Sequence, residues 1–214
     1  MAAPQQLSPT EARILGVLVE KEATVPDTYP LSLNALQAGC NQKSARDPVM
    51  TLSEAELLAA IDELRGHSLV IESSGGRVTR YGHNLGRVYG LPTPAVALLT
   101  QLILRGPQTA AELRANCERL YRFADTSSVE AFLEELATRA AGALTLLLPR
   151  APGARESRWA HLLCGEPDLP ASPLVATSAG QEAGLREEVA ALREEVASLR
   201  AGLASLREQL GITD

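Results

Sequence analysis

The stretch "LVIESSGGRVTRY", residues 69–81, decides the fold that we expect for this chain. Two runs rich in β-branched and aromatic residues flank Ser74, Gly75 and Gly76, and this pattern predicts a β-hairpin with a short loop. Three segments with helical periodicity come before it, so the local order is helix, helix, helix, hairpin. That order is typical of a winged helix, in which the second and third helices form a helix-turn-helix and the hairpin is the wing.

The helix starts are marked by capping boxes, in which a Ser or Thr hydroxyl and a Glu three residues later satisfy free backbone N–H groups. Four such spacings are present: Ser8…Glu11, Ser53…Glu56, Thr109…Glu112 and Ser127…Glu130. The first also has Pro9 at the first helical position. Apolar residues at helical spacing follow Ser8, Ser53 and Ser127, so we expect a helix to begin directly after each of them.

The same order of elements occurs a second time, with "ALTLLLP" (143–149) and "SRWAHLL" (157–163) as the second hairpin. Apolar positions of the two copies align at offsets of 84, 77 and 72 residues: Ile14 with Leu98, Leu36 with Leu113, and Leu57 with Val129. The shrinking offset means that the second copy is shorter. We therefore predict a mainly α protein with small β-hairpins, of the α+β class, with two tandem winged-helix domains at 7–90 and 91–164.

The last part of the chain predicts a linker and a dimerisation helix. Residues 165–181 are rich in Pro, Gly, Ser and Ala, as flexible linkers are. Over 182–211, apolar residues alternate in steps of four and three, the heptad pattern of a two-stranded coiled coil. The dimer contacts would be Leu185, Val189, Leu192, Val196, Leu199, Leu203, Leu206 and Leu210. Glu188 would face Arg193 of a parallel second strand, which favours a parallel homodimer; the alternative is one amphipathic helix packed on the domains.

Composition limits the function classes. The net charge is −6, and residues 166–214 hold nine acidic and four basic side chains, so the preceding residues are nearly neutral. This balance argues against binding nucleic acid through bulk charge. The three cysteines lack the CxxC spacing of zinc sites and give no disulfide framework. The sequence shows neither a secretory leader nor an apolar run of membrane-spanning length, so we expect a cytoplasmic protein without membrane contact.

Four blocks of sequence resemble the YceH-like family of bacterial proteins. They are "LSPTEARILGVLVEKE", "TVPDTYPLSLNALQAGCNQKSARDPV", "RVTRYGH" and "LRGPQTAAELR", so the resemblance covers about residues 7–164. The resemblance implies a tandem winged-helix fold, and it implies no catalytic or binding residues. A small departure is the Gly75-Gly76 pair, where a Gly-Ser is expected in the wing.

The sequence carries none of the motifs GxSxG, HExxH, GxGxxG or the Walker loop. The three histidines, His67, His83 and His161, are scattered, and we expect structural roles for them. Cys40 and Cys117 occupy equivalent positions in the two copies, which favours buried, small apolar residues; a thiol switch is the alternative. We therefore predict a protein that is not an enzyme and that holds no cofactor or metal.

Charge at the third helices bears on nucleic-acid binding. Glu54 and Glu56 open the third helix of the first copy and Glu130 that of the second, whereas a helix that reads DNA presents Lys or Arg to phosphates. Contacts to double-stranded DNA or a protein would therefore come from cations elsewhere: Lys43, Arg46, Arg77, Arg80, Arg114, Arg119 and Arg122. We favour a dimeric DNA-binding or transcription-associated regulator, because such regulators often bind two half-sites as dimers. A protein–protein adaptor is the alternative.

The stretch "NQKSARDPV", residues 41–49, replaces the usual short turn between the second and third helices. Proline disfavours the helical conformation of the residue before it, so Asp47-Pro48 predicts an ordered loop here. The loop would bring Lys43 and Arg46 to the face that a helix-turn-helix presents to DNA. A structural brace, in which its polar groups bond to helix ends, is an equal alternative.

Overall fold

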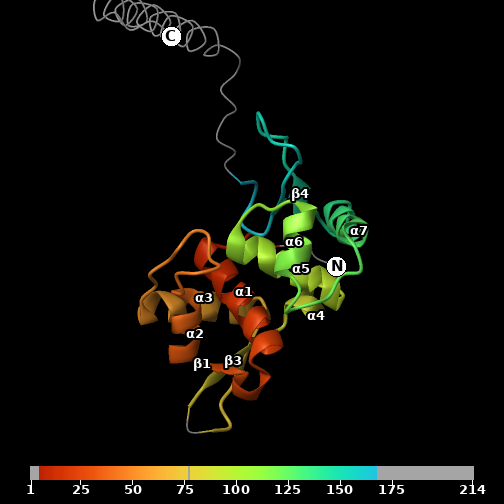
Figure 1. Ribbon diagram of the computed structural model, residues 1–214. Helices are drawn as coiled ribbons and strands as arrows, with labels where there is room; N and C mark the ends of the chain where they lie inside the picture. The colour runs from red at the N-terminus through yellow and green to blue at the C-terminus, as the bar shows by residue number, and fades with distance from the viewer. Residues whose placement is uncertain (1–4, 77, 168–214) are drawn as a thin grey trace, which may run out of the picture. The chain divides into compact units, whose positions relative to one another are not determined.

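The computed structural model describes residues 5–76 and 78–167, which belong to one compact unit (Figure 1). The predicted coiled coil and most of the predicted linker lie outside the described residues. The helices are α1 (Pro9–Thr24), α2 (Leu33–Cys40), α3 (Glu54–Gly66), α4 (Leu85–Tyr89), α5 (Thr93–Arg105), α6 (Ala110–Asn116) and α7 (Thr126–Ala137), with a 3-10 turn at Pro26–Thr28. The strands are β1 (Leu31–Ser32), β2 (Val70–Ser73), β3 (Arg80–His83), β4 (Thr145–Leu147) and β5 (Trp159–His161). Helices with small antiparallel sheets make an α+β protein, as predicted.

Both predicted hairpins are present, and a further strand extends the first. We call residues up to 90 the first half of the unit and residues from 91 the second half. In the first half, the antiparallel sheet has the order β1-β3-β2, and Leu31 of β1 pairs with Tyr81 of β3. In the second half, β4 pairs with β5, and the place of the third strand is taken by a single bridge between Gln108 and Trp159. Gln108 follows Leu31 by 77 residues, the offset of the second helices. The sequence repeat is therefore also a repeat of strand pairing.

Three of the four predicted capping boxes are formed, those at Ser8, Ser53 and Thr109. The fourth prediction was wrong, because α7 begins at Thr126 and its N-cap is Asp125. The Asp125 carboxylate accepts from the backbone N–H of Ser128 at 2.7 Å. Asp is among the best N-cap residues, so it starts the helix two residues before Ser127 could.

The first helices of the two halves, α1 and α5, pack against each other at the centre of the unit (Figure 1). Residues 12–19 of α1 and 95–104 of α5 are all buried, which means that both helices are covered on all sides. A Cβ added at Gly16 would lie 2.9 Å from Leu104 Cδ2 and 3.0 Å from Ile103 Cγ2. The absence of a side chain at Gly16 therefore allows the two helices to approach closely.

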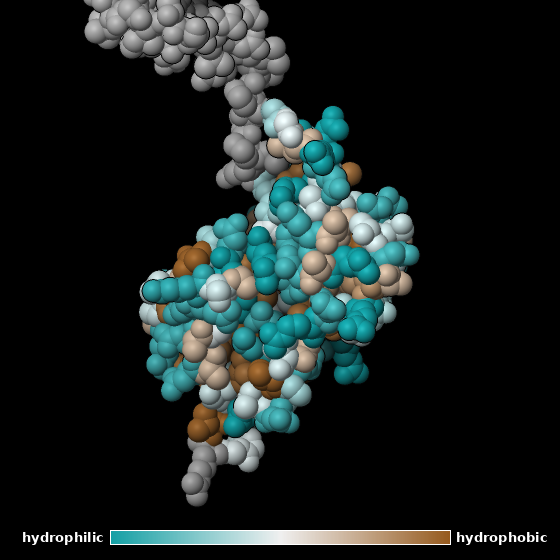
Figure 2. Space-filling model, viewed as in Figure 1, coloured by the Kyte–Doolittle hydropathy of each residue, from teal (hydrophilic) through white to brown (hydrophobic). Residues whose placement is uncertain are grey.

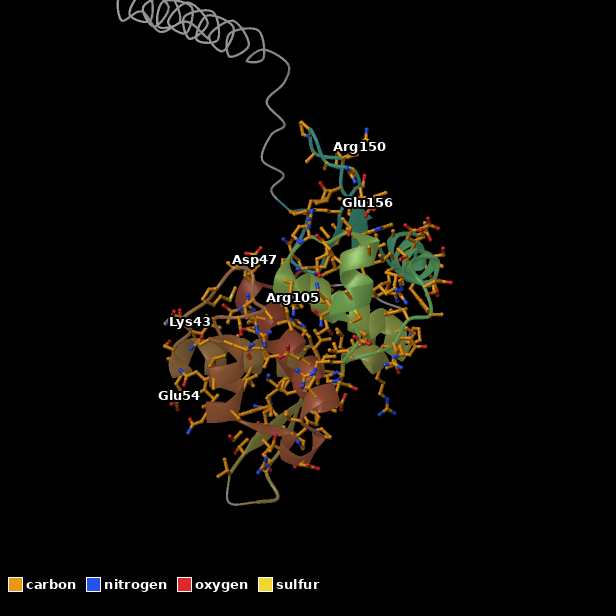
Figure 3. All side chains as sticks on the ribbon, in the orientation of Figure 1. Lys43, Asp47, Glu54, Arg105, Arg150 and Glu156 are labelled. Atoms are coloured by element: carbon orange, nitrogen blue, oxygen red, sulfur yellow. The ribbon has the colours of Figure 1, made fainter. Side chains whose placement is uncertain are left out.

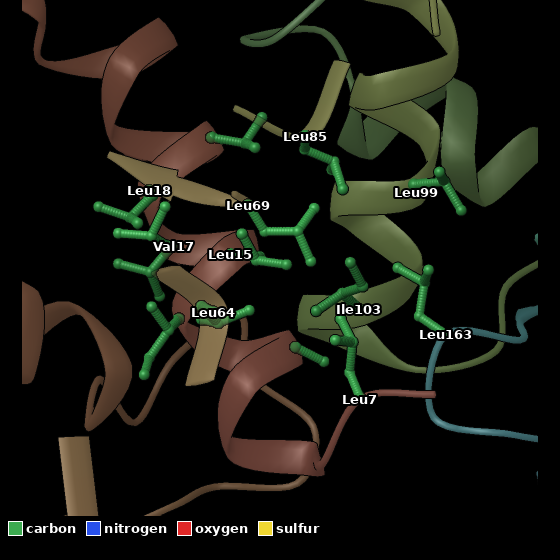
Figure 4. Packing of buried hydrophobic residues seen from close by; sticks show 14 of the residues in the cluster. Leu7, Leu15, Val17, Leu18, Leu64, Leu69, Leu85, Leu99, Ile103 and Leu163 are labelled. Atoms are coloured by element: carbon green, nitrogen blue, oxygen red, sulfur yellow. The ribbon is translucent and has the colours of Figure 1, made fainter. Parts of the chain in front are cut away.

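One hydrophobic cluster spans both halves, and the second half has a further cluster of its own. One cluster of buried residues contains Leu15 and Leu18 from α1, Ile103 from α5 and Leu163 from the end of the second half (Figure 4). A backbone hydrogen bond also joins the start of the chain to the end of the second half, because the N–H of Leu7 donates to Leu163 O at 2.7 Å. The division into two domains at residues 90 and 91 stays a prediction, and the shared core shows that the halves stabilise each other.

Replacing Gly16 by Leu tests the close approach of α1 and α5. The added side chain would overlap Leu104, and we expect a free energy of unfolding lower by about 3 kcal/mol, as for other overpacked cores. The matched control is Gly66→Leu at the end of α3, where an added Cβ meets no atom within 4 Å. Urea unfolding followed by circular dichroism measures both. Equal losses in the two variants would contradict the packing described here.

Candidate interaction surfaces

The loop between α2 and α3, residues 41–53, is held from inside by Arg46. The Arg46 side chain is fully buried, and its guanidinium donates to both carboxylate oxygens of Glu20 at 3.1 and 2.6 Å. Its Nε also donates to Gly39 O at 3.3 Å. Arg46 therefore cannot contact DNA or a partner from this position, in contrast to the sequence prediction, and the loop has the character of a structural brace.

A second buried arginine, Arg13, holds the same loop and was missed by sequence reasoning. It is only 1% exposed, and it donates to Cys40 O at 3.1 Å and to Pro48 O at 2.6 Å. Asn41 then closes the loop, because its amide accepts from Leu52 N at 2.7 Å and donates to Leu52 O at 2.9 Å. The one sequence signal for Arg13 is its place among the consecutive apolar residues of α1, where no helical face remains for solvent.

Burial and pairing set the protonation of this cluster. Burial lowers the pKa of Arg13, and the neighbouring charge of Arg46 lowers it further. Burial would raise the pKa of Glu20, but the hydrogen bonds and charge of Arg46, helped by Lys21, outweigh it and leave that pKa below its usual value. A depressed carboxylate pKa means that the pair stabilises the fold at neutral pH and that this contribution is lost in acid.

The remaining cations of the first half have separate surroundings. Lys43 is exposed on the outside of the loop (Figure 3). Arg80 is exposed, yet its Nη1 donates to Thr28 O at 3.2 Å and to Pro30 O at 2.8 Å, which ties β3 to the segment before β1. Arg77 lies outside the described residues. Of the described residues, Lys43 is thus exposed on the loop between α2 and α3, and Arg80 is bonded to the segment before β1.

The second half does bring two of its predicted cations together. Arg114 of α6 and Arg122 of the loop before α7 line one surface hollow of about 700 Å³, together with Phe123 and Ala124. Arg114 Nη2 donates to Ala124 O at 3.1 Å, and Arg122 forms an exposed pair with Glu118 at 3.5 Å. Arg119 is exposed as well but is not part of the lining.

Carboxylates are the commonest exposed side chains on the outward faces of the third helices. On α3 the exposed residues include Glu54, Ala55, Leu58, Asp62 and Glu63, and on α7 they are Ser127, Glu130, Ala131, Glu134 and Glu135. Arg65 is the exposed cation of α3, and it pairs with Asp62 at 3.2 Å and with Glu72 at 3.0 Å. Both helices therefore present carboxylates where a groove-reading helix presents cations.

The large apolar side chains that remain exposed are scattered over both halves. They include Val49 of the loop, Ile71 of β2 and Leu147 of β4. Figure 2 shows the consequence for one face, where hydrophilic residues dominate and hydrophobic ones form small separate areas. None of the helices within residues 5–76 and 78–167 has the length and hydropathy needed to cross a membrane.

The cysteines and histidines of the described residues have structural surroundings. Burial raises the pKa of Cys40 and of Cys117 to about 12, so neither thiol ionises at neutral pH. Burial lowers the pKa of His161 to about 4. His83 Nε2 lies 2.7 Å from the Glu22 carboxylate. Within residues 5–76 and 78–167, no group of three or more His, Cys, Asp or Glu side chains could hold a metal ion.

Comparison with known proteins places these features in a family. The model of the DUF480 family, described as a protein of unknown function, matches residues 7–154. The chain belongs to this family. A UPF0502 protein of Leptothrix cholodnii is 67% identical over 180 residues, which are 84% of this chain and 80% of the relative. A UPF0502 protein of Burkholderia vietnamiensis is 64% identical over 182 residues, 85% of this chain and 74% of the relative. The matched DUF480 region contains both the braced loop and the hollow.

The buried pair predicts a large effect of Arg46. Replacing Arg46 by Ala removes the two hydrogen bonds to the largely buried Glu20 carboxylate and leaves it only the single contact with Lys21 at 3.1 Å, so we expect the free energy of unfolding to fall by about 3 kcal/mol. Lys43→Ala in the same loop is the control and should change it by less than about 0.5 kcal/mol. Urea unfolding measures both, and an Arg46→Ala variant as stable as the control would rule out the brace.

The low pKa of His161 predicts loss of stability in weak acid. Between the usual histidine pKa of about 6.5 and about 4, the unfolded chain binds a proton that folded His161 does not, so stability falls by up to about 3 kcal/mol as pH decreases. His161→Gln should remove this part of the fall, and His67→Gln should retain it. Unfolding free energies at pH 7.5 and pH 4.5 measure the difference; identical pH profiles of wild type and His161→Gln would contradict the assignment.

Proposed function

We propose that this protein is a non-enzymatic adaptor that binds other proteins through a tandem winged-helix scaffold and forms a homodimer through a coiled coil at 182–211. The observation that carries the proposal is the acidity of both third helices. Glu54 and Asp62 on α3, and Glu130 and Glu134 on α7, are exposed where a helix-turn-helix would meet phosphates. Carboxylates at these positions repel DNA and leave the scaffold suited to protein contacts.

The winged-helix interpretation is supported by the order of the elements. Three helices precede an antiparallel hairpin in each half, as α1, α2, α3, β2 and β3 and again as α5, α6, α7, β4 and β5. The strand that precedes α2 pairs with the hairpin in the first half, and a single bridge holds the same place in the second. Repetition of this plan, with a wing after each third helix, fits two winged-helix modules.

Several arginines of the first half form contacts within the fold, which also favours the adaptor function over DNA binding. Arg46 is buried against Glu20, Arg80 donates to two backbone carbonyls, and Arg65 pairs with carboxylates of α3 and β2. A DNA-binding protein commonly makes about six to ten contacts between its cations and phosphates, and each contact releases counterions from the DNA. Arg46, Arg65 and Arg80 are therefore engaged within the fold, and these three arginines are less available for such contacts.

DNA binding by a dimeric regulator is the second candidate, and one observation favours it. Arg114 and Arg122 line the same hollow, and Arg119 is exposed nearby. If the protein binds duplex DNA, this part of the second half would supply the phosphate contacts, and Lys43 would add one from the first half.

Salt-dependent binding to duplex DNA separates the two functions. The adaptor predicts no saturable binding of a labelled duplex of mixed sequence below about 100 μM at physiological salt, the range of non-specific binding. A regulator that uses the second-half arginines should bind more tightly, and Arg114→Gln with Arg122→Gln should make the slope of log K against log salt shallower by about 1.8. Arg150→Gln with Arg155→Gln, on the β4–β5 hairpin, is the control for general charge. Tight binding that depends on Arg114 and Arg122 would contradict the adaptor.

A further inference from the structure

The hollow beside α6 has an equivalent place in the first half of the unit. Both second helices end at a buried cysteine, Cys40 or Cys117, and both third helices begin after an N-cap, Ser53 or Asp125. The two cysteines differ by 77 positions and the two N-caps by 72. The offset of 77 therefore aligns residues around the ends of the second helices, and the offset of 72 aligns residues around the starts of the third helices.

One hydrogen bond is common to both places. In the first half, Gln37 Nε2 donates to Leu52 O at 3.0 Å. In the second half, Arg114 Nη2 donates to Ala124 O at 3.1 Å. Gln37 aligns with Arg114 on the second helix, and Leu52 and Ala124 each directly precede the N-cap of the third helix. The same contact therefore holds the chain against the second helix in both halves.

The residues that surround this hydrogen bond differ between the two halves. Leu52 is partly buried against the core, and the Asn41 amide pairs with both of its backbone groups. Ala124 is exposed and lacks the larger side chain, and Glu118, which aligns with Asn41, pairs with Arg122. The connecting loop is also shorter, with seven residues between cysteine and N-cap compared with twelve in the first half. A hollow of about 700 Å³ is present in the second half.

The chemistry of the hollow fits an apolar group next to negative charge. Phe123, Ala111 and Ala115 supply apolar lining. Arg122 has 84% of its side chain exposed, and Arg114 has one hydrogen bond to protein, to Ala124 O. Guanidinium groups bind carboxylates with two parallel hydrogen bonds, which gives both energy and orientation. Glu118 is the one carboxylate in the lining, and a partner carboxylate would replace it beside Arg122.

We propose that the hollow docks a short extended segment of a partner protein, with an apolar side chain flanked by carboxylates. This segment would take the place that Leu52 and its longer loop take in the first half. The occupant is inferred from two observations: the first half shows non-helical chain in the equivalent place, and the two arginines of the hollow complement acidic side chains. The inference rests on the proposed function, because it names the class of partner that the adaptor would bind.

A peptide of three Glu-Leu-Glu-Ser repeats, labelled with fluorescein, tests the proposal by fluorescence anisotropy on the full chain. Wild-type protein should bind it saturably at low salt, and should bind the peptide with Gln in place of Glu about tenfold more weakly. Ala124→Leu, which places in the hollow the side chain that Leu52 has, should also weaken binding about tenfold without changing any charge. Arg122→Gln should weaken it similarly, and its loss removes only an exposed pair.

The controls separate the hollow from general charge and from unfolding. Arg150→Gln with Arg155→Gln removes two exposed charges from the β4–β5 hairpin and should leave binding unchanged (Figure 3). Thermal melting should be the same for Ala124→Leu and wild type, because a leucine before an N-cap is tolerated at the equivalent Leu52. No saturable binding of the Glu peptide by wild type would overturn the proposal.

Three other results are informative in different ways. If Ala124→Leu does not weaken binding of the peptide, the hollow is not the binding site, and the adaptor function is not contradicted. Equal weakening by the hairpin control would show attraction to net charge alone and would also overturn the site. Displacement of the peptide by duplex DNA, with DNA binding lost in Arg122→Gln, would assign the hollow to nucleic acid and contradict both the site and the adaptor.

Discussion

The ion pair between Arg46 and Glu20 holds the loop through which the first half contacts the end of α5. It places a guanidinium inside the protein, where it must stay paired because an isolated buried charge is strongly destabilising. Held in this way, the loop brings Asp47 to the end of α5, and Asp47 N donates to Leu104 O at 2.7 Å. A bond made within the first half thus fixes a contact to the second, beside the close approach of α1 and α5.

Local sequence features predicted the three helices and the hairpin of each half, but they did not predict β1, α4 or the contacts between residues far apart in the sequence. The first hairpin follows from short runs around Gly75 and Gly76, the second follows from the runs at 143–149 and 157–163, and three capping boxes follow from residues three apart. Arg46 was expected at the surface because it lies in the loop between the second and third helices, and its partner Glu20 lies 26 residues earlier, on α1. The start of α7 failed for a local reason, since Asp125 and Ser127 both suit an N-cap and only the Asp125 geometry decides between them.

The repeat explains the shared plan of the halves, and the residues that differ between the two copies explain how the loops before the third helices differ. Alignment by sequence found the apolar positions, such as Leu57 and Val129, because a buried helix face restricts residue type. It could not reveal that Leu52 packs against the core whereas Ala124 at the equivalent position is exposed, since that comparison needs the hydrogen bonds that Gln37 and Arg114 donate to these two residues. The first half has a loop braced by the buried Arg46, and the second half has a hollow lined by Arg114 and Arg122.

Hydrogen exchange at the backbone amide of Asp47, followed by NMR, is the most direct measurement of whether the loop is a brace between the halves. The amide is bonded to Leu104 O, and its release requires the loop to leave α5. We predict protection close to that of the central α1 amides and its loss in Glu20→Gln, because opening then no longer has to break the ion pair. Exchange in wild type as fast as at the exposed Lys43 amide would contradict this account.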